Sequence, residues 1–241
     1  MVNLDDQSID LVVTSPPYPM IEMWDSILGQ QNAEITTALA EKQPRKAFEL
    51  MHQVLDPVWS ECFRVLKEGS FLCINIGDAT RTINGEFAVY NNSMRITQAC
   101  ETLGFTTLPC ILWRKPTNAP NKFMGSGMLP CGAYVTLEHE WILIFRKGGK
   151  KKYTTTRSKA NRRESSFFWE ERNLWFSDLW ELRGTKQKIQ SPISRTRNAS
   201  YPTEIPYRLI NMFSERGDTI LDPFAGLGTT TIAAILSERN S

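Results

Sequence analysis

Residues 14–18 (Thr-Ser-Pro-Pro-Tyr) combine a stiff backbone with groups that could hold a planar amine. They end the apolar, β-branched run 9–14, which predicts a buried strand leading into this turn. Because the two prolines exclude helix and ladder pairing, the Ser15 hydroxyl and the Pro16 carbonyl would be held at fixed positions. Both oxygens could accept hydrogen bonds from an amino group, and Tyr18 offers an aromatic face for stacking. Taken alone, a turn of this kind is more often structural.

A second turn, residues 222–230 (Asp-Pro-Phe-Ala-Gly-Leu-Gly-Thr-Thr), could approach a nucleotide-like ligand. Its two glycines, Gly226 and Gly228, would let the backbone come close to such a ligand. The turn is not a P-loop, because no Gly-Lys-Ser/Thr follows, and Thr231 stands where a Gly-x-Gly-x-x-Gly motif would end. On its own, the turn is equally compatible with an ordinary strand-to-helix junction.

The elements that must position these turns alternate along the chain. Apolar runs predict further strands at residues 71–76, 106–114, 138–146 and 219–221. Helical periodicity predicts helices at residues 45–66, 91–103, 204–213 and 229–238. Gly69 is expected to stop the first of these helices, and residues 19–44 are expected to be mostly loop with one short helix. This alternation predicts a mainly parallel α/β sheet, in which ligands bind at the carboxyl ends of the strands.

The composition is that of an ordinary globular chain. The 241 residues are 41% hydrophobic and 22% charged, which excludes collagen-like, coiled-coil and mostly disordered classes. The net charge of +2 does not by itself indicate nucleic acid. No apolar run approaches the roughly 20 residues that span a bilayer, and the N-terminus is polar and acidic, so we expect a cytoplasmic protein without membrane contact.

The five cysteines form no Cys-x-x-Cys pair, and most lie among apolar residues. This pattern favours buried free thiols in a reducing compartment over a zinc site. His139 lies between two glutamates, but on an alternating strand pattern, so a structural or hydrogen-bonding role is expected there. The sequence therefore predicts no metal site.

Residues 147–200 interrupt the α/β pattern and are interpreted as an insertion. The first part of the insertion is strongly basic, and Trp169, Trp175 and Trp180 follow it. These tryptophans are expected to pack a small core belonging to the insertion. The basic run by itself could equally be a solvated loop.

Taken together, the two turns resemble those of the amino-methylating DNA methyltransferases, which use S-adenosylmethionine and modify cytosine N4 or adenine N6. The order of the turns, with the basic segment between them, is similar to the β group of that family. Residues 113–116 (Trp-Arg-Lys-Pro) and 137–140 (Leu-Glu-His-Glu) resemble the family's paired strands beyond the catalytic turn. Residues 201–206 resemble the segment before the cofactor turn, although the family more often has His where Tyr201 stands.

The resemblance covers nearly the whole chain and implies a Rossmann-like methyltransferase fold. The sheet would be mainly parallel with an antiparallel strand and would carry helices on both faces. Residues 1–146 would form the catalytic part, residues 147–200 an inserted target-recognition region, and residues 201–241 the cofactor-binding part. Compared with the family pattern, both ends look clipped. A Gly-Asp strand and turn is expected upstream, and an acid for the ribose about 20 residues after the glycine turn, beyond Ser241.

The resemblance also implies a mechanism. The target base would leave the duplex stack, Tyr18 would stack on it, and its amino group would donate to Ser15 and to the Pro16 carbonyl. The methyl group would pass by direct in-line displacement, without a covalent enzyme–base intermediate. The implied catalytic residues are Ser15, Pro16, Pro17 and Tyr18. The implied cofactor-binding residues are Thr203, Asp222, Pro223, Phe224, Gly226, Gly228 and Thr229.

The implied partner is double-stranded DNA, with a cognate restriction endonuclease as a further possibility. Phosphate contacts are expected from Lys150, Lys151, Lys152, Arg157, Lys159, Arg162 and Arg163. Ser15 stands where other members have Asp, which favours cytosine N4 over adenine N6. Three alternatives stay open: adenine N6 methylation, a truncated or inactive DNA-binding relative, and methylation of RNA or of a protein amide.

Overall fold

A mixed six-stranded sheet organises the computed structural model, which describes residues 1, 3–115, 129–132, 134–184 and 201–241. Its order is β7-β5-β6-β2-β1-β8. The strands are β1 (Ile9–Thr14), β2 (Leu66–Ile76), β5 (Phe105–Arg114), β6 (His139–Lys147), β7 (Leu179–Glu181) and β8 (Ile220–Leu221). β6 runs antiparallel to both of its neighbours, whereas β1, β2, β5, β7 and β8 share one direction. The expected mainly parallel sheet with an antiparallel strand is confirmed.

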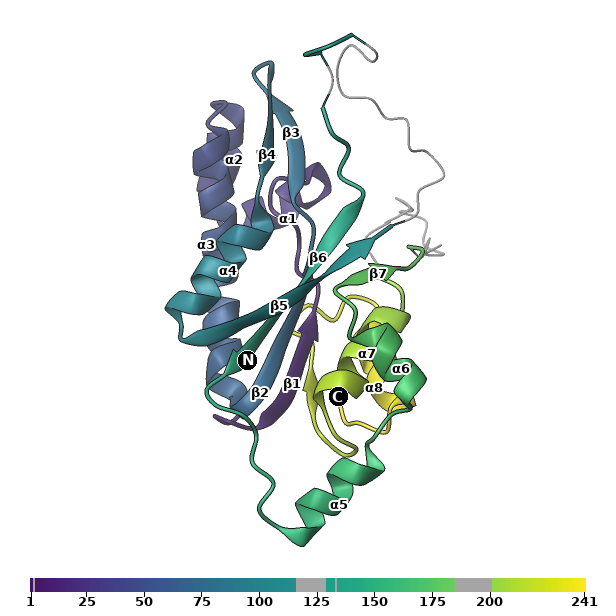
Figure 1. Ribbon diagram of the computed structural model, residues 1–241. Coiled ribbons are helices and arrows are strands. Elements are labelled where there is room, and N and C mark those ends of the chain that lie inside the picture. Colours follow the sequence, from purple (N-terminus) through teal and green to yellow (C-terminus); the bar gives the residue numbers. More distant parts are fainter. Residues whose placement is uncertain (2, 116–128, 133, 185–200) are drawn as a thin grey trace.

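Helices cover both faces of this sheet (Figure 1). α3 (Pro44–Val65) and α4 (Asn92–Thr102) pack on one face, and α7 (Glu204–Phe213) and α8 (Thr229–Leu236) pack on the other. β1 shows why, because its successive apolar side chains point to opposite faces of the sheet. Val12 contacts the α3 side, while Leu11 and Val13 contact the α7 side. A strand buried on both faces has a continuous apolar sequence, as residues 9–14 do.

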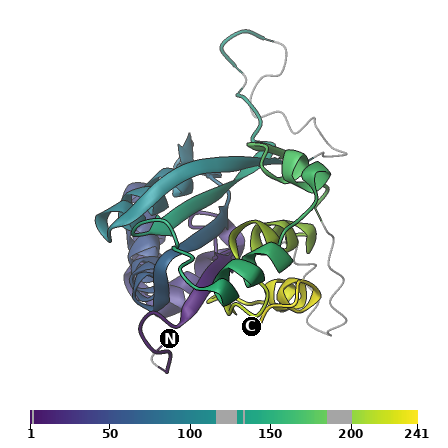
Figure 2. The same ribbon diagram turned by 60° about the horizontal axis from the view of Figure 1, so that its bottom comes forward.

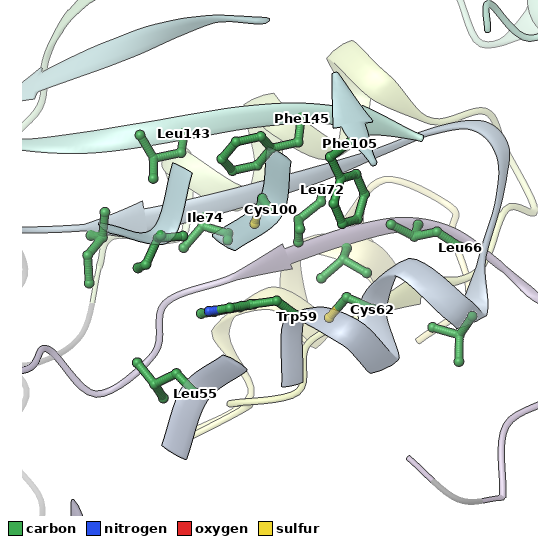
Figure 3. Close-up of a cluster of buried hydrophobic side chains, with 14 of the residues drawn as sticks. Leu55, Trp59, Cys62, Leu66, Leu72, Ile74, Cys100, Phe105, Leu143 and Phe145 are labelled. Carbon is green, nitrogen blue, oxygen red and sulfur yellow. The ribbon is translucent and has the colours of Figure 1, made fainter. Parts of the chain in front are cut away.

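The core between α3 and the sheet is closely packed (Figure 3). Trp59 of α3 lies under Leu72 and Ile74 of β2, and all three side chains are fully buried. Burying one such aliphatic side chain contributes about 1.5–3 kcal/mol relative to leaving it exposed. This packing helps to hold β2 in register with β1, so that the two parallel strands end at the same edge of the sheet.

The junction between α3 and β2 differs from the expectation. Gly69 does not stop the helix, because α3 ends at Val65 and β2 begins at the next residue. Lys147 closes the helix end, and its Nζ donates to the carbonyl oxygens of Phe63 and Leu66 at 2.7 Å each. Gly69 instead has a φ of +81° within β2, at an irregularity in the pairing with β1. The left-handed conformation explains why glycine stands there.

The expectation for residues 19–44 is wrong. This stretch forms a 3-10 turn at Glu22–Trp24, α1 (Asp25–Gln31) and α2 (Ala33–Ala40). Leu28 and Ile35 of these helices are buried together with Met51 of α3 and Tyr90. Helices this short are marginal alone, and their burial against α3 stabilises them.

A second small sheet was not foreseen. β3 (Ala79–Ile83) and β4 (Glu86–Tyr90) form a two-stranded hairpin. Asn84 and Gly85 at its tip have φ values of 55° and 81°, as a tight hairpin turn with two left-handed residues requires. The Asn-Gly dipeptide was the signal for this hairpin.

Part of residues 147–200, the predicted insertion, belongs to the main sheet. This segment contains α5 (Thr156–Glu164), α6 (Trp169–Trp175) and β7, which pairs in parallel with β5. Trp180 is 1% exposed and packs with Tyr201 and Leu209, so it belongs to the core beside α7. The expected separate core is therefore wrong for Trp180, and Trp169 is exposed. Residues 185–200 lie outside the described part.

Candidate active site

The two turns identified from the sequence meet at one edge of the sheet. Residues 15–18 follow β1 and residues 222–228 follow β8, and these two strands pair in parallel. Neighbouring parallel strands place their carboxyl ends side by side, which is where open α/β sheets bind ligands. Thr14 Oγ1 donates a hydrogen bond of 2.5 Å to Asp222 Oδ1 and so links the two turns directly.

Asp222 is the centre of the second turn. Its Oδ1 also accepts from the Phe224 backbone N–H at 3.0 Å, and its Oδ2 accepts from Thr230 Oγ1 at 2.6 Å. Because Thr230 gives its proton to Asp222, the hydroxyl of Tyr201 must donate to Thr230, 2.5 Å away. Donors of the protein thus engage both carboxylate oxygens, and the observed role of Asp222 is to hold the turn in shape.

One cavity of about 290 Å³ opens between the turns. The first turn contributes Ser15, Pro16 and Tyr18, and the second contributes Phe224 and Gly226. The remaining lining residues are Ile21, Met23, Trp24, Asn75, Trp113, Lys115, Glu140 and Tyr201. The cavity therefore has apolar and aromatic walls with a few convergent polar groups, as ligand sites do.

The polar groups of the cavity form a connected network. Tyr18 OH lies 3.3 Å from Ser15 Oγ and donates to Glu140 Oε2 at 2.8 Å. Asn75 Nδ2 donates to Tyr18 OH and to Glu140 Oε2, both at 2.7 Å. Lys115 Nζ forms an ion pair with Glu140 Oε1 and lies over the Trp113 ring, 4.4 Å from its centroid. Five side chains from four segments thus hold one another at the cavity wall.

The tyrosine of this network stays neutral. Burial raises the pKa of Tyr18 well above its ordinary value, and the charge of Glu140 raises it further. A neutral phenol keeps its proton, so Tyr18 is the donor in the bond to Glu140. Gly77 makes room for this ring, because a Cβ there would lie 3.0 Å from Tyr18 Cε2.

Asn75, Lys115 and Glu140 were missed as site residues in the sequence. Asn75 is 3% exposed and is the polar side chain in the otherwise apolar end of β2. Lys115 and Glu140 lie in the two short segments noted for their resemblance, 113–116 and 137–140. A polar residue inside an apolar strand was the available signal for Asn75.

The other expected cofactor residues lie around the second turn. Gly228 is the N-cap of α8 with a φ of +78°, and Thr229 is the first residue of the helix. No side chain caps this helix start. Of the predicted cofactor residues, only Phe224 and Gly226 are among those that line the cavity. The others are outside the lining: Thr203, which precedes α7, Asp222, Pro223, Gly228 and Thr229. Of the predicted catalytic residues, Pro17 is likewise outside the lining.

The structure does not bring the seven predicted phosphate-contacting residues to this cavity. All seven are exposed. α5 lies beyond the N-terminal ends of the parallel strands, at the edge opposite to the cavity (Figures 1 and 2). Lys151 Nζ lies 3.3 Å from Glu215 and 3.5 Å from Asp218, and Arg162 stacks over the Tyr153 ring. A second hollow there includes Asp10, at the start of β1. The six residues of β1 separate the two edges by about 16 Å.

Two further observations concern the described residues only. Within them, no three His, Cys, Asp or Glu side chains gather as a metal site would require, and His139 packs edge-on against Trp141. No helix in the same part of the chain is both long and apolar enough to cross a bilayer. Cys62, Cys73 and Cys100 are buried free thiols, while Cys131 is exposed.

Comparison with known proteins places this chain in a family. A family described as DNA methylase, of the N6/N4 methyltransferase type, matches residues 9–241. The type II methyltransferase M.MthZI of Methanothermobacter thermautotrophicus is 51% identical over 243 residues, covering 100% of this chain and 68% of that protein. M.MjaI of Methanocaldococcus jannaschii is 51% identical over 252 residues, covering 100% of this chain and 82% of that protein.

Solved structures share the fold. TTHA0409 of Thermus thermophilus, in complex with S-adenosyl-L-methionine, has a TM-score of 0.73 and 32% identity, covering 99% of this chain and 82% of that one. The cytosine-N4-specific PvuII DNA methyltransferase has a TM-score of 0.59 at 18% identity, covering 99% of this chain and 75% of its own, which shows likeness of fold alone. Since the family match spans residues 9–241 and two relatives are half identical over the whole chain, this chain belongs to the N6/N4 DNA methylase family.

Proposed function

We propose that this chain transfers a methyl group from S-adenosylmethionine to the exocyclic amino group of a base flipped out of double-stranded DNA. The observation that carries the proposal is the cavity that both turns line. Direct transfer needs the amino nitrogen and the methyl carbon in contact, so their binding sites must share one space. The family membership and the S-adenosyl-L-methionine in the TTHA0409 structure support the same interpretation.

The residues of the first turn suit an amino group. Ser15 Oγ and the Pro16 carbonyl oxygen would accept its two hydrogens, which draws the nitrogen lone pair out of conjugation and toward the methyl group. The Tyr18 ring would stack on the base. Pro17 would act through the backbone, by keeping the turn rigid.

The residues of the second turn fit S-adenosylmethionine. A Cβ added at Gly228 would meet nothing within 4 Å, so the space over the turn is open. The uncapped N-terminus of α8 leaves backbone N–H groups free for a carboxylate such as that of the methionine part. Phe224 and Gly226 would contact the cofactor from the cavity wall, with Pro223, Thr229 and Thr203 around them. Bound there, the cofactor supplies an electrophilic methyl group on a positively charged sulfur.

We propose cytosine N4 as the methylated atom. The support is Ser15 at the position where many family members have Asp, and adenine N6 is the alternative. The basic side chains near α5 would contact DNA phosphates only if the duplex extends to the far edge of the sheet. A cognate endonuclease and a cytoplasmic location stay predictions.

A transfer assay tests the proposed function. The chain is incubated with radiolabelled S-adenosylmethionine and with duplex DNA of mixed sequence, structured RNA or a peptide. Label in DNA alone is expected, and label in RNA or peptide instead would overturn the proposal. Calorimetry with S-adenosylmethionine tests the alternative of an inactive DNA-binding relative, which predicts no cofactor binding.

A further inference from the structure

A line of hydrogen bonds runs along the cavity wall to a partly buried carboxylate. Ser15 Oγ lies 3.3 Å from Tyr18 OH, and Tyr18 OH lies 2.8 Å from Glu140 Oε2. The Glu140 side chain is 13% exposed and is paired with Lys115. The line thus begins at the proposed acceptor for the target amino group and ends at a carboxylate on the wall of the same cavity.

The carboxylate fixes the direction of every bond in this line. An ionised Glu140 can only accept, so the phenol proton of Tyr18 points toward it. Asn75 Nδ2 donates to the phenol oxygen from another side, at 2.7 Å. The phenol has one proton, already given to Glu140, so in the contact with Ser15 it can only accept. The Ser15 proton therefore points at Tyr18. Asn75 Nδ2 approaches one lone pair of Ser15 Oγ at 3.5 Å, and the other lone pair remains for a donor in the cavity.

We infer that Glu140 is a positioning residue that acts through Tyr18, making Ser15 a hydrogen-bond acceptor and receiving the proton that the methylated amino group releases. The inference rests on the proposed function. It adds a role for a side chain of β6, on a segment far in sequence from both turns.

The proton count balances along this path. The lone pair of the amino nitrogen forms the new N–C bond, the S–C bond breaks, and its electron pair returns to sulfur. The nitrogen, now positively charged, gives one proton to Ser15 Oγ. In the same movement Ser15 gives its proton to Tyr18, and Tyr18 gives its proton to Glu140. Glu140 becomes a neutral acid and returns to its ionised form by losing the proton to water.

A double-mutant cycle tests this inference. Y18F removes the phenol oxygen and keeps the ring, and E140Q keeps the size of the side chain and removes the charge. We measure single-turnover methyl transfer and the affinities for S-adenosylmethionine and DNA. Each single variant is expected to lower the transfer rate about 100-fold, with both affinities within about twofold of wild type. E138Q is the matched control, because Glu138 lies two residues away and pairs with Arg114 instead.

The double variant separates this role from a merely structural one. If Glu140 acts through Tyr18, Y18F/E140Q is no slower than the slower single variant. Independent, multiplying effects would overturn the inference, and so would an E140Q rate like that of E138Q. NMR of tyrosine labelled with ¹³C at Cζ gives a readout without activity. The Tyr18 signal is expected to move in E140Q and not in E138Q, and an unmoved signal would contradict the proposed direction. Absence of transfer by the wild type would count against the proposed function. The NMR signal would still show whether Tyr18 donates its hydrogen bond to Glu140.

Discussion

Thr14 and Asp222 are 208 positions apart in the chain, and their side chains form a hydrogen bond of 2.5 Å. Thr14 ends the strand before the first turn, residues 15–18, and Asp222 begins the second turn, residues 222–228. Through this bond, each turn fixes the position of the other, so the geometry that the proposed transfer requires is set before either substrate binds. Preorganisation of this kind is what a direct displacement needs.

Replacing Asp222 by Asn tests this connection. The amide cannot accept from Thr14, Phe224 and Thr230 together, so one buried donor loses its partner. We expect the free energy of unfolding to fall by about 1–3 kcal/mol and the affinity for S-adenosylmethionine to fall more than that for DNA. Urea unfolding and calorimetry measure both. Asp5→Asn on the exposed N-terminal segment is the control, and equal behaviour of the two variants would contradict the proposed role of the bond.

Ser15→Ala tests the first turn. The variant lacks the proposed acceptor for the amino group but keeps the backbone of the turn. We expect transfer to fall about 100-fold or more, while S-adenosylmethionine binding and thermal unfolding stay as in the wild type. Transfer at the normal rate by a folded S15A protein would exclude the assigned role.

Gly77→Ala tests the space that the Tyr18 ring needs. The added Cβ would lie 3.0 Å from Tyr18 Cε2 and 3.3 Å from Glu140 Cγ, so the ring must shift. We expect slower transfer and a higher KM for DNA, with cofactor affinity unchanged. Gly149→Ala is the matched control, because its Cβ would meet nothing within 4 Å. If both variants keep normal kinetics, the ring position does not matter for transfer.

His52 makes stability depend on pH. It is buried in α3 and bonded to Asn92, whose Nδ2 donates to the carbonyl oxygens of Pro19 and Gly77 beside the site. Burial lowers the pKa of His52 from 6.5 to about 4. Between these values the unfolded chain binds a proton that the native state does not, so stability falls as pH drops from 6.5 toward 4. At 1.36 kcal/mol per pKa unit, the loss is on the order of 3 kcal/mol.

The variant His52→Gln checks this assignment. Glutamine can still donate to Asn92 but does not titrate, so its urea midpoint should change less between pH 7 and pH 5 than that of the wild type. A pH dependence identical to that of the wild type would assign the effect to other groups.

Arg157→Glu with Lys159→Glu tests the predicted phosphate contacts near α5. If these exposed side chains touch DNA, affinity falls and the slope of log K against log salt weakens by about 0.9 for each lost contact. Lys46→Glu, on the exposed side of α3, is the control. A salt slope of the double variant equal to that of the Lys46→Glu control would show that the duplex does not reach this edge.

The two turns could be predicted from the sequence because each is a short run whose chemistry is local. Prolines, glycines and the acid of the cofactor turn impose their geometry within a few residues. The alternation of strands and helices likewise follows from local periodicity, and it predicted β1, α3, α4 and α7 closely.

The rest of the site depends on contacts between distant segments. Asn75, Lys115 and Glu140 come from three places in the chain, and the pairing of β6 with β2 and with β5 brings them together. The helices of residues 25–40 were missed for a related reason. Their apolar residues are few, and burial against α3 rather than local propensity stabilises them. The position of α5 could not be foreseen either, because charge alone does not say at which edge of a sheet a helix lies.

The most direct test of the central claim is the identity of the methylated atom. Duplex DNA of mixed sequence is incubated with the chain and S-adenosylmethionine carrying a deuterated methyl group, and the nucleosides are analysed by mass spectrometry. We expect N4-(trideuteromethyl)cytosine with the wild type and almost none with S15A. Deuterated N6-methyladenine would preserve the mechanism and correct the assigned base. A folded, cofactor-binding chain that labels cytosine at C5, or labels DNA equally well without the Ser15 hydroxyl, would contradict the proposed mechanism.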